Sequence, residues 1–229
     1  MEPIGLSPVL IDQVYDRLVE AIADGTLAPG QRIRQEQLAD LLGVSRQPVS
    51  HALQLLKRQR LVVEHGKRFL AIAALDPARV QALYQVRAVL DALAARQAAE
   101  AVAAGTASAA DRTAAEQALA AGRALRPGSP VGAYIQADVA FHAALYALSG
   151  NPALAETVAP QWPHFKRSMG AVLGEAPLQT TVWSEHEAIL ARVLAGDAAA
   201  AEHAAREHSL RSGVETARRL GARAPAAAE

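Results

Sequence analysis

Residues Gln35–Ala52 read QEQLADLLGVSRQPVSHA, which is the pattern of two helices joined by a tight turn. Gly43 stands in the turn, where glycine adopts a positive φ most easily. Ser45 is a good N-cap for the second helix, and Pro48 falls in the first turn of that helix, where its missing N–H costs nothing. The stretch therefore predicts a helix-turn-helix.

The sequence on both sides of this stretch predicts a winged helix. Val14, Leu18 and Ile22 recur at helical spacing and indicate a preceding amphipathic helix. Two short apolar runs flank the turn His65-Gly66-Lys67-Arg68 and predict a β-hairpin, the only strand pair that we expect. The expected elements are helices over 9–24, 35–42 and 46–59 and strands over 61–64 and 69–72. The alternative is a structural helical hairpin with a solvated basic face.

Charge is balanced over the whole chain but not locally. Lys and Arg number 23, and Asp and Glu also number 23, so the net charge is zero. Residues 31–70 nevertheless carry eight basic and three acidic side chains, a local excess of five positive charges. A local basic patch is what a DNA backbone attracts. The second helix of the pair would present its N-terminus, with Arg46 and Gln47, to base edges and phosphates.

The remainder of the chain predicts an all-helical unit. Hydrophobic residues make up 51% of the sequence, much of it alanine, and aromatic residues only 4%, which favours helices over a β-sandwich. Asp76 and Pro77 suit a helix start and mark a boundary. Helices are expected over about 77–104, 109–124, 130–149, 152–173, 178–195 and 197–221.

The predicted fold class is mainly α, with a winged helix-turn-helix of three helices plus a β-hairpin, followed by an all-α helical bundle. The expected divisions are an N-terminal tail (1–8), the DNA-binding domain (9–74), the helical domain (75–222) and a disordered tail (223–229).

Several features that would place the protein outside the cytoplasm are missing from the sequence. There is no cysteine, which fits a reducing compartment and excludes disulfides and thiolate metal sites. The N-terminus lacks the pattern of a signal peptide, and no apolar run approaches the roughly 20 residues that cross a bilayer. We therefore expect a cytoplasmic protein without a membrane partner.

Four side chains in the helical half form a candidate metal site. Asp138 and His142 are four residues apart on one expected helix, so they face the same way. His186 and His208 lie on two later helices, and a bundle can bring such side chains together. One carboxylate and three imidazoles suit Zn²⁺, Ni²⁺, Mn²⁺ or Fe²⁺, and we favour Zn²⁺ or Ni²⁺. The alternatives are core or surface histidines and a local Asp–His helix contact.

Both halves of the chain resemble one family of regulators. Residues 14–69 resemble the DNA-binding domain of the GntR family, and the matching positions include Gly25, Pro29-Gly30, Leu38-Ala39, Gly43-Val44-Ser45-Arg46, Pro48-Val49 and Ala52-Leu53. Residues 87–210 resemble the FCD sensor domain of the FadR-type branch, on the stretches Arg87–Ala95, Asp138–His142, Ser149–Asn151 and Glu185–Leu190.

The resemblance implies a transcription regulator, usually a repressor. Because one winged helix covers few base pairs, we expect a homodimer on a palindromic double-stranded DNA operator. The residues expected to contact DNA are Arg34, Ser45, Arg46, Gln47, Ser50, His51, His65, Gly66, Lys67 and Arg68. The family usually has an arginine four residues after the one that matches Arg46. This chain has Ser50 followed by His51, which leaves that contact open.

For the helical half, the resemblance implies that Asp138, His142, His186 and His208 bind a metal and that Arg87 lies near the ligand cavity. A small carboxylate effector would fill open metal positions and form a charge-assisted bond to Arg87, and so change operator affinity. The family's usual glutamate four residues after this arginine is replaced by Asp91.

The alternative function is a metal-dependent helical-bundle enzyme, with Glu185 or Glu187 as the general acid or base beside the metal. The winged helix has no role in such an enzyme, so the sequence favours a regulator without catalytic residues. A scaffold without a ligand would leave the Asp/His quartet unexplained.

Overall fold

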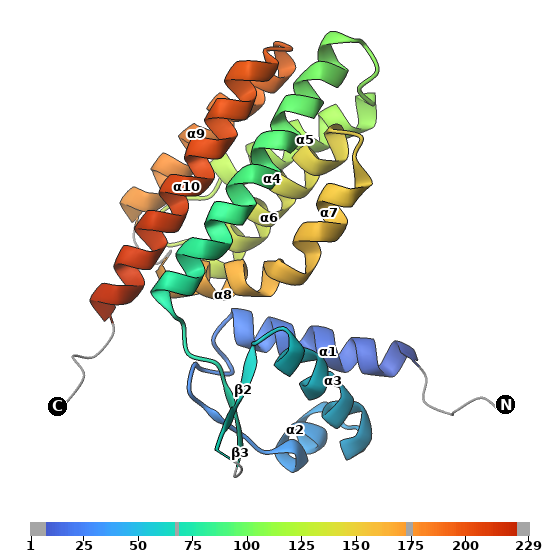
Figure 1. Cartoon of the computed structure of the whole chain (residues 1–229), viewed down its shortest axis with the longest axis vertical. Coiled ribbons are helices and arrows are strands. Elements are labelled where there is room, and N and C mark those ends of the chain that lie inside the picture. The colour runs from blue at the N-terminus through green and yellow to red at the C-terminus, as the bar shows by residue number, and fades with distance from the viewer. Residues whose placement is uncertain (1–7, 67–68, 173–175, 224–229) are drawn as a thin grey trace, which may run out of the picture. The chain divides into compact units, whose positions relative to one another are not determined.

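The computed structural model describes residues 8–66, 69–172 and 176–223, and the chain divides into two compact units between Leu75 and Asp76 (Figure 1). The predicted tails, 1–8 and 223–229, fall almost entirely outside the described residues. Pro8 and Arg223 are the exceptions, because they begin the first helix and end the last one.

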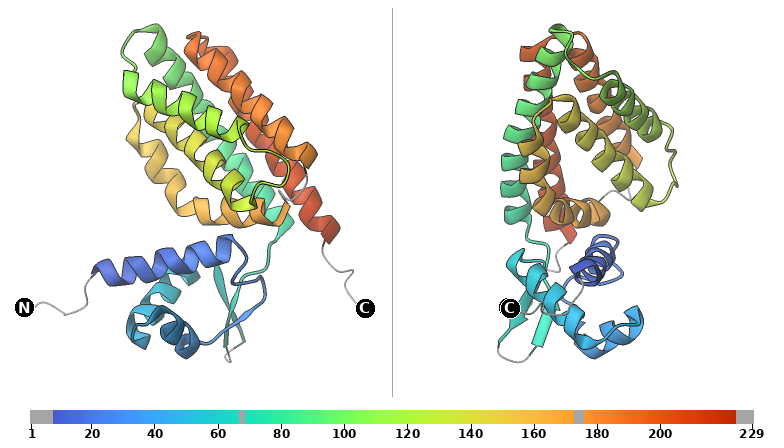
Figure 2. Two further views of the ribbon diagram at one scale, coloured as in Figure 1. Left: turned by 180° about the vertical axis from the view of Figure 1, so that it is seen from behind. Right: turned by 90° about the vertical axis from the view of Figure 1, so that its right-hand side faces the viewer.

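The N-terminal unit packs helices beside a small sheet (Figure 2). Its elements are α1 (Pro8–Ala23), β1 (Arg32–Ile33), α2 (Gln35–Leu42), α3 (Arg46–Arg58), β2 (Val62–His65) and β3 (Phe69–Ile72). α1 packs on α3, and the buried side chains of Val14, Leu18 and Ile22 share one core with Val49 and Leu53. Each such buried aliphatic side chain contributes about 1.5–3 kcal/mol to folding.

The turn between α2 and α3 has the predicted backbone geometry. Gly43 has φ 65° and ψ 32°, the left-handed conformation that glycine adopts most easily. Ser45 occupies the N-cap position of α3 with an extended backbone, but its side chain makes no capping hydrogen bond. The prediction that this hydroxyl caps α3 is therefore wrong. The Ser45 side chain is exposed and can bind another partner.

The sheet has one strand more than the sequence predicted. The strand order is β1-β3-β2 with antiparallel pairing throughout, and β2 and β3 form the predicted hairpin. β1 pairs with the other edge of β3, where Arg32 lies opposite Ala71. Its two residues are too few to show a strand's alternation, so the expectation of a single strand pair was wrong.

The C-terminal unit is a helical bundle (Figures 1 and 2). Its elements are α4 (Pro77–Ala103), α5 (Ala109–Arg123), α6 (Val131–Leu148), α7 (Pro152–Val158), the 3₁₀ helix η1 (Ala159–Gln161), α8 (Trp162–Val172), α9 (Ala176–Leu194) and α10 (Ala198–Arg223). Asp76 caps α4 as expected, because its carboxylate accepts a hydrogen bond from the N–H of Ala78 at 3.0 Å.

The two longest helices, α4 and α10, lie side by side and form the main packing contact of the bundle. Gly213 permits this close approach, since an added Cβ there would stand 2.5 Å from Cβ of Tyr84. None of the helices in the described ranges is both long and apolar enough to span a membrane.

One predicted helix is broken. The sequence predicted a continuous helix over 152–173, and the structure divides it into α7, η1 and α8. Pro160 and Pro163 lie at the break. Proline lacks the N–H of a helical hydrogen bond and its ring clashes with the preceding turn, so these two residues oppose a continuous helix. The change of direction lets α8 pack on α6 and α10, and its first residue, Trp162, reaches the buried polar cluster of the bundle.

Candidate functional site

The bundle brings the four predicted metal ligands together. Asp138 and His142 lie one turn apart on α6, whereas His186 lies on α9 and His208 on α10. All four are buried, with exposed fractions of 8%, 1%, 0% and 3% in that order. Burying ionisable side chains is costly unless partners compensate, so the cluster needs a ligand or a complete hydrogen-bond network.

The three histidines form the tightest part of this cluster. Each histidine contributes one ring nitrogen to a set of three nitrogens that all lie within 4.8 Å of one another. Nε2 of His186 is 3.1 Å from Nε2 of His208. Asp138 stands at the edge, because its Oδ1 is 3.6 Å from Nε2 of His186 and 4.0 Å from Nε2 of His142. The geometry is a three-histidine donor set with an adjoining carboxylate.

Several polar atoms of the cluster make no hydrogen bond within the described residues. The buried atoms without such a partner are both ring nitrogens of His142, Nδ1 of His186 and Oδ2 of Asp138. Buried polar atoms of proteins are hydrogen-bonded in nearly all cases, so these atoms are available to bind a ligand. Imidazole nitrogens and carboxylate oxygens are the donors that hold Zn²⁺ and similar ions. The residues present therefore fit a divalent metal.

Burial keeps two of the histidines in the form that binds metal. The pKa of His142 is lowered from its usual 6.5 by burial and by the nearby Arg87 charge, against the opposing effect of Asp91. The pKa of His186 lies well below 6.5, because of burial and then the charges of His208 and His142. Neutral imidazoles carry the lone pair that a metal requires.

Arg87 on α4 lies beside the histidines between two carboxylates. Its Nε is 3.3 Å from Oδ2 of Asp91, and its Nη2 is 3.6 Å from Oδ2 of Asp138. The guanidinium also lies over the rings of Trp162 and Phe165, 4.9 Å from each centroid. Burial alone would lower the pKa of Arg87, but the two carboxylates outweigh it and raise the pKa. Arg87 is thus a permanent buried cation.

Asp91 has a role that the sequence did not reveal. It is fully buried and accepts hydrogen bonds from the hydroxyls of Tyr146 and Ser209, and its Oδ2 lies 3.4 Å from Nδ1 of His142. Burial disfavours its charge, but His142 and Arg87 outweigh burial and lower the pKa of Asp91. The carboxylate therefore joins α4, α6 and α10. Its spacing from Arg87 was the only sequence signal.

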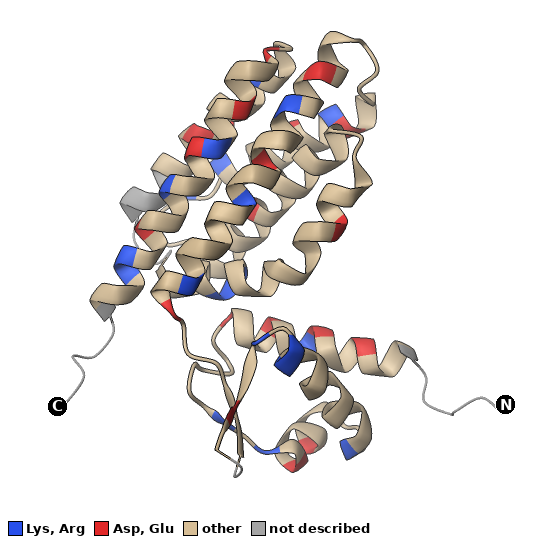
Figure 3. Ribbon diagram, in the orientation of Figure 1, with Lys and Arg blue, Asp and Glu red and all other residues tan. Residues whose placement is uncertain are grey.

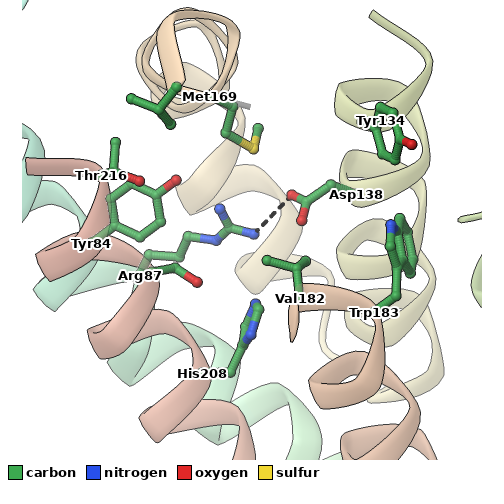
Figure 4. Close-up of a pocket in the computed structure, with 11 residues that line it drawn as sticks. Tyr84, Arg87, Tyr134, Asp138, Met169, Val182, Trp183, His208 and Thr216 are labelled. Carbon is green, nitrogen blue, oxygen red and sulfur yellow. Dashed lines mark ion pairs between the residues drawn. The ribbon is translucent and has the colours of Figure 1, made fainter. Parts of the chain in front are cut away.

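A cavity of about 40 Å³ opens beside the cluster (Figure 4). Its charged or ionisable wall is formed by Arg87, Asp138 and His208, and the guanidinium and carboxylate point toward each other. The other lining residues are Tyr84, Tyr134, Met169, Val172, Val182, Trp183, Ser212 and Thr216. The space accommodates a few water molecules or a short organic group, with mostly apolar and aromatic walls.

Trp183 forms one wall of the cavity, and its ring packs directly against a glycine of α5. A Cβ added to Gly122 of α5 would stand 1.9 Å from Cη2 of the Trp183 ring. The ring also meets His186 edge-on, with centroids 4.8 Å apart. Gly122 therefore decides where the tryptophan ring lies, and through it the shape of the cavity.

In the N-terminal unit, most predicted DNA-contacting residues of the helix pair are exposed. They are Arg34, Ser45, Arg46, Gln47 and His51, whereas Ser50 is half-buried. Within the helix pair itself, the acidic residues Glu36 and Asp40 lie on α2, and the basic residues Arg46, Lys57 and Arg58 lie at the two ends of α3 (Figure 3). Arg46 forms an exposed ion pair with Glu36 of α2. Exposed pairs are weak, so a DNA phosphate or guanine can replace Glu36.

The wing is described only in part. His65 and Gly66 are exposed, and His65 stacks on Phe69 with ring centroids 5.4 Å apart. Lys67 and Arg68 lie outside the described residues. Arg32 lies over the same Phe69 ring, 4.9 Å from its centroid, so β1 adds a basic side chain beside the wing. The sequence had counted Arg32 only as charge.

Both units match known families. Residues 10–69 match the family described as bacterial regulatory proteins, gntR family, and residues 82–211 match the FCD domain. An uncharacterized HTH-type transcriptional regulator in an unstable DNA locus of Streptomyces ambofaciens is 30% identical over 93% of this chain and 86% of that protein. The uncharacterized HTH-type regulator YdhC of Bacillus subtilis (strain 168) is 37% identical, over 36% of this chain and 37% of YdhC.

Solved structures share the fold. E. coli McbR/YncC superposes with a TM-score of 0.76 and 20% identity, covering 92% of this chain and 97% of that one. A putative transcriptional regulator GntR from Rhodococcus sp. RHA1 gives a TM-score of 0.75 and 20% identity, covering 90% and 96%. At such identities the likeness concerns the fold alone.

Proposed function

The chain belongs to the GntR family of bacterial regulatory proteins and carries an FCD domain, and on that premise we propose that it is a repressor released from its operator by a small organic acid. Family membership makes it a DNA-binding transcription regulator, and its families and relatives are regulators, not enzymes. The finer proposal is that a divalent metal and the acid bind together in the helical bundle and change operator affinity.

The metal is held by His142, His186 and His208, with Asp138 as the fourth ligand. The observation that carries this proposal is the set of buried, unsatisfied ring nitrogens that converges from α6 and α9 beside His208 of α10. Zn²⁺ or Ni²⁺ suits these donors. When bound, the ion supplies open coordination positions for a carboxylate.

Charge explains why the acid would need the metal. With neutral histidines, Arg87 contributes one positive charge, and Asp91 and Asp138 contribute two negative ones, so the cluster is net negative. A net negative, buried cavity repels an anion. A divalent ion reverses the sign of the cluster, so the cavity then favours an acid.

Arg87 is the proposed anchor for the acid. Its Nε and Nη2 atoms are buried and have no hydrogen-bond partner among the described residues, although two carboxylates lie nearby. A ligand carboxylate would give these N–H groups charge-assisted bonds. Because the cavity measures about 40 Å³ and has apolar walls, we propose an acid of only a few carbon atoms.

Operator binding is proposed for a homodimer. The exposed N-terminal end of α3 and the wing present few side chains per copy, so two copies on a palindrome double the contacts. Arg46 would leave Glu36 to contact a base edge or phosphate.

The enzyme alternative lacks a placed general base. Glu187 is on the surface, paired with Arg123. Glu185 is bonded to Nδ1 of His208 and to Arg211, and it does not line the cavity beside the cluster. Neither carboxylate therefore faces a substrate bound in that cavity.

The test is binding of the full-length protein to the DNA upstream of its own gene, with and without Zn²⁺ and a panel of two- to four-carbon hydroxy and keto acids. We expect the zinc-loaded protein to bind and at least one acid to release it. Failure to bind DNA in every state contradicts the proposed operator. Binding that no acid alters contradicts the proposed effector class.

A further inference from the structure

Glu185 stands next to a proposed metal ligand in sequence but contacts a different one in space. It precedes His186 on α9, and its Oε2 lies 2.7 Å from Nδ1 of His208 on α10. Its other oxygen, Oε1, lies 2.5 Å from a guanidinium nitrogen of Arg211, which follows His208 by about one turn on α10. The carboxylate is therefore held from two sides, and neither contact involves the metal-facing nitrogen of His208.

This contact decides which nitrogen of His208 carries the proton. A carboxylate only accepts hydrogen bonds, so Nδ1 of a neutral His208 must be the donor. The proton on Nδ1 leaves Nε2 with its lone pair. Nε2 is the nitrogen that faces the cluster, 3.1 Å from Nε2 of His186. His208 is thus already in the tautomer and orientation that metal binding through Nε2 requires.

The other two histidines lack such a partner in the described part of the chain. Nδ1 of His186 and both ring nitrogens of His142 are buried without a hydrogen bond. Asp91 comes within 3.4 Å of Nδ1 of His142, which is a longer and weaker contact than the 2.7 Å between Glu185 and Nδ1 of His208. His208 is therefore the ligand that the protein itself orients before metal arrives.

We propose that Glu185 is a positioning residue, which fixes His208 as the Nδ1–H tautomer, aims Nε2 into the cluster and thereby raises metal affinity. The inference rests on the proposed metal site. Outer carboxylates of this kind fix the ring orientation of metal-bound histidines and increase their basicity in other proteins. Arg211 holds Glu185 in place, and Glu185 is itself largely buried, with a side chain 17% exposed.

The experiment compares full-length wild type with Glu185→Ala, Glu185→Gln and the control Glu187→Ala. Glu187 lies two residues away on the same helix, but its carboxylate is exposed and pairs with Arg123. Zn²⁺ affinity is measured by competition with a chromophoric chelator. In the metal-free proteins, ring ¹⁵N shifts of labelled histidines, assigned by a His208→Gln spectrum, report the His208 tautomer.

We expect Glu185→Ala to weaken Zn²⁺ binding by about 10–100-fold and to abolish the pure Nδ1–H signature of His208. Glu185→Gln keeps an acceptor oxygen, so it should retain the tautomer and recover part of the affinity. Glu187→Ala should match wild type in both measurements. If Glu185→Ala does not fold, the positioning role is still tested by two measurements. These are the His208 tautomer in wild type and the Zn²⁺ affinity of Glu185→Gln.

Two failures are distinguishable. Wild type that binds no Zn²⁺ overturns the proposed metal site and this inference with it. Wild type that binds Zn²⁺ while Glu185→Ala binds equally well, or a wild-type His208 in the Nε2–H form, overturns the positioning role alone.

Discussion

The Nη2 atom of Arg87 lies 3.6 Å from Oδ2 of Asp138, while the other oxygen of the same carboxylate lies 3.6 Å from Nε2 of His186. One carboxylate therefore faces both the proposed effector anchor and the proposed metal site. A change in what either side binds alters the position or charge balance of Asp138. We propose this shared group as the physical basis for coupling between a bound metal and a bound acid in the bundle.

Metal should stabilise the folded bundle. The proposed ligands come from α6, α9 and α10, so the site exists only in the folded state. Zn²⁺ at about 100 times its dissociation constant should raise the free energy of unfolding by about 2.7 kcal/mol. His142→Ala should remove most of this gain, as measured by chemical denaturation. His203→Ala, an exposed histidine on α10, is the control and should behave as wild type. An equal gain in His142→Ala would show that zinc binds elsewhere.

The metal-free protein should lose stability in mild acid. The folded pKa values of His142 and His186 are lowered from 6.5, so below about pH 6.5 the unfolded chain binds protons that the folded state refuses. The stability that these histidines contribute is present above that pH and is lost as pH falls, by up to roughly 1.4 kcal/mol per unit for each group. Urea denaturation from pH 7.5 to 5 measures the slope. His142→Gln should reduce it, and an unchanged slope would contradict the burial argument.

Arg46 should read one position of the operator. It is exposed at the first position of α3 and is held only by the weak surface pair with Glu36. Arg46→Ala should weaken operator binding by about 1–3 kcal/mol and relax preference at one base pair. Fluorescence anisotropy against a set of single-base operator variants measures both. Arg58→Ala, at the far end of α3, is the control. Equal losses on every DNA sequence would mean that Arg46 contacts only the backbone.

Gly122 should act on the cavity through Trp183. Gly122→Ala inserts a methyl group where the indole now lies, so either the ring or α5 must shift. We expect a loss of about 1–3 kcal/mol in unfolding free energy, a changed tryptophan emission and an altered response to acids. Gly132→Ala, at a helical position on α6 with open space, is the control and should be neutral or stabilising. A stable Gly122→Ala with unchanged emission would contradict this packing.

Much of the fold was predictable because local signals agreed with it. The helix-turn-helix depends on Gly43 and the apolar spacing around it, and both are visible in the sequence. β1 escaped prediction because two residues cannot show a period. The break at Pro160 was missed because the apolar pattern of the segment continues through it, although proline opposes a continuous helix.

The candidate site was predictable to a smaller extent. The Asp138–His142 spacing placed two side chains on one face, whereas their convergence with His186 and His208 is a property of helix packing. The i, i+4 spacing of Asp91 from Arg87 is visible in the sequence. The hydrogen bonds of Asp91 to Ser209 and of Glu185 to His208 run between helices, so the sequence around Asp91 and Glu185 does not indicate these partners.

The most direct test of the central claim, that metal makes the bundle responsive to an acid, is operator anisotropy for the full-length protein in four states. These are wild type and His142→Ala, each loaded with Zn²⁺ or treated with chelator, titrated with the acid that releases the zinc-loaded wild type. We predict release in the zinc-loaded wild type alone, with comparable DNA affinity in the other three states before acid is added. The claim would be contradicted if the acid released chelator-treated wild type and His142→Ala from the operator as fully as it releases the zinc-loaded wild type.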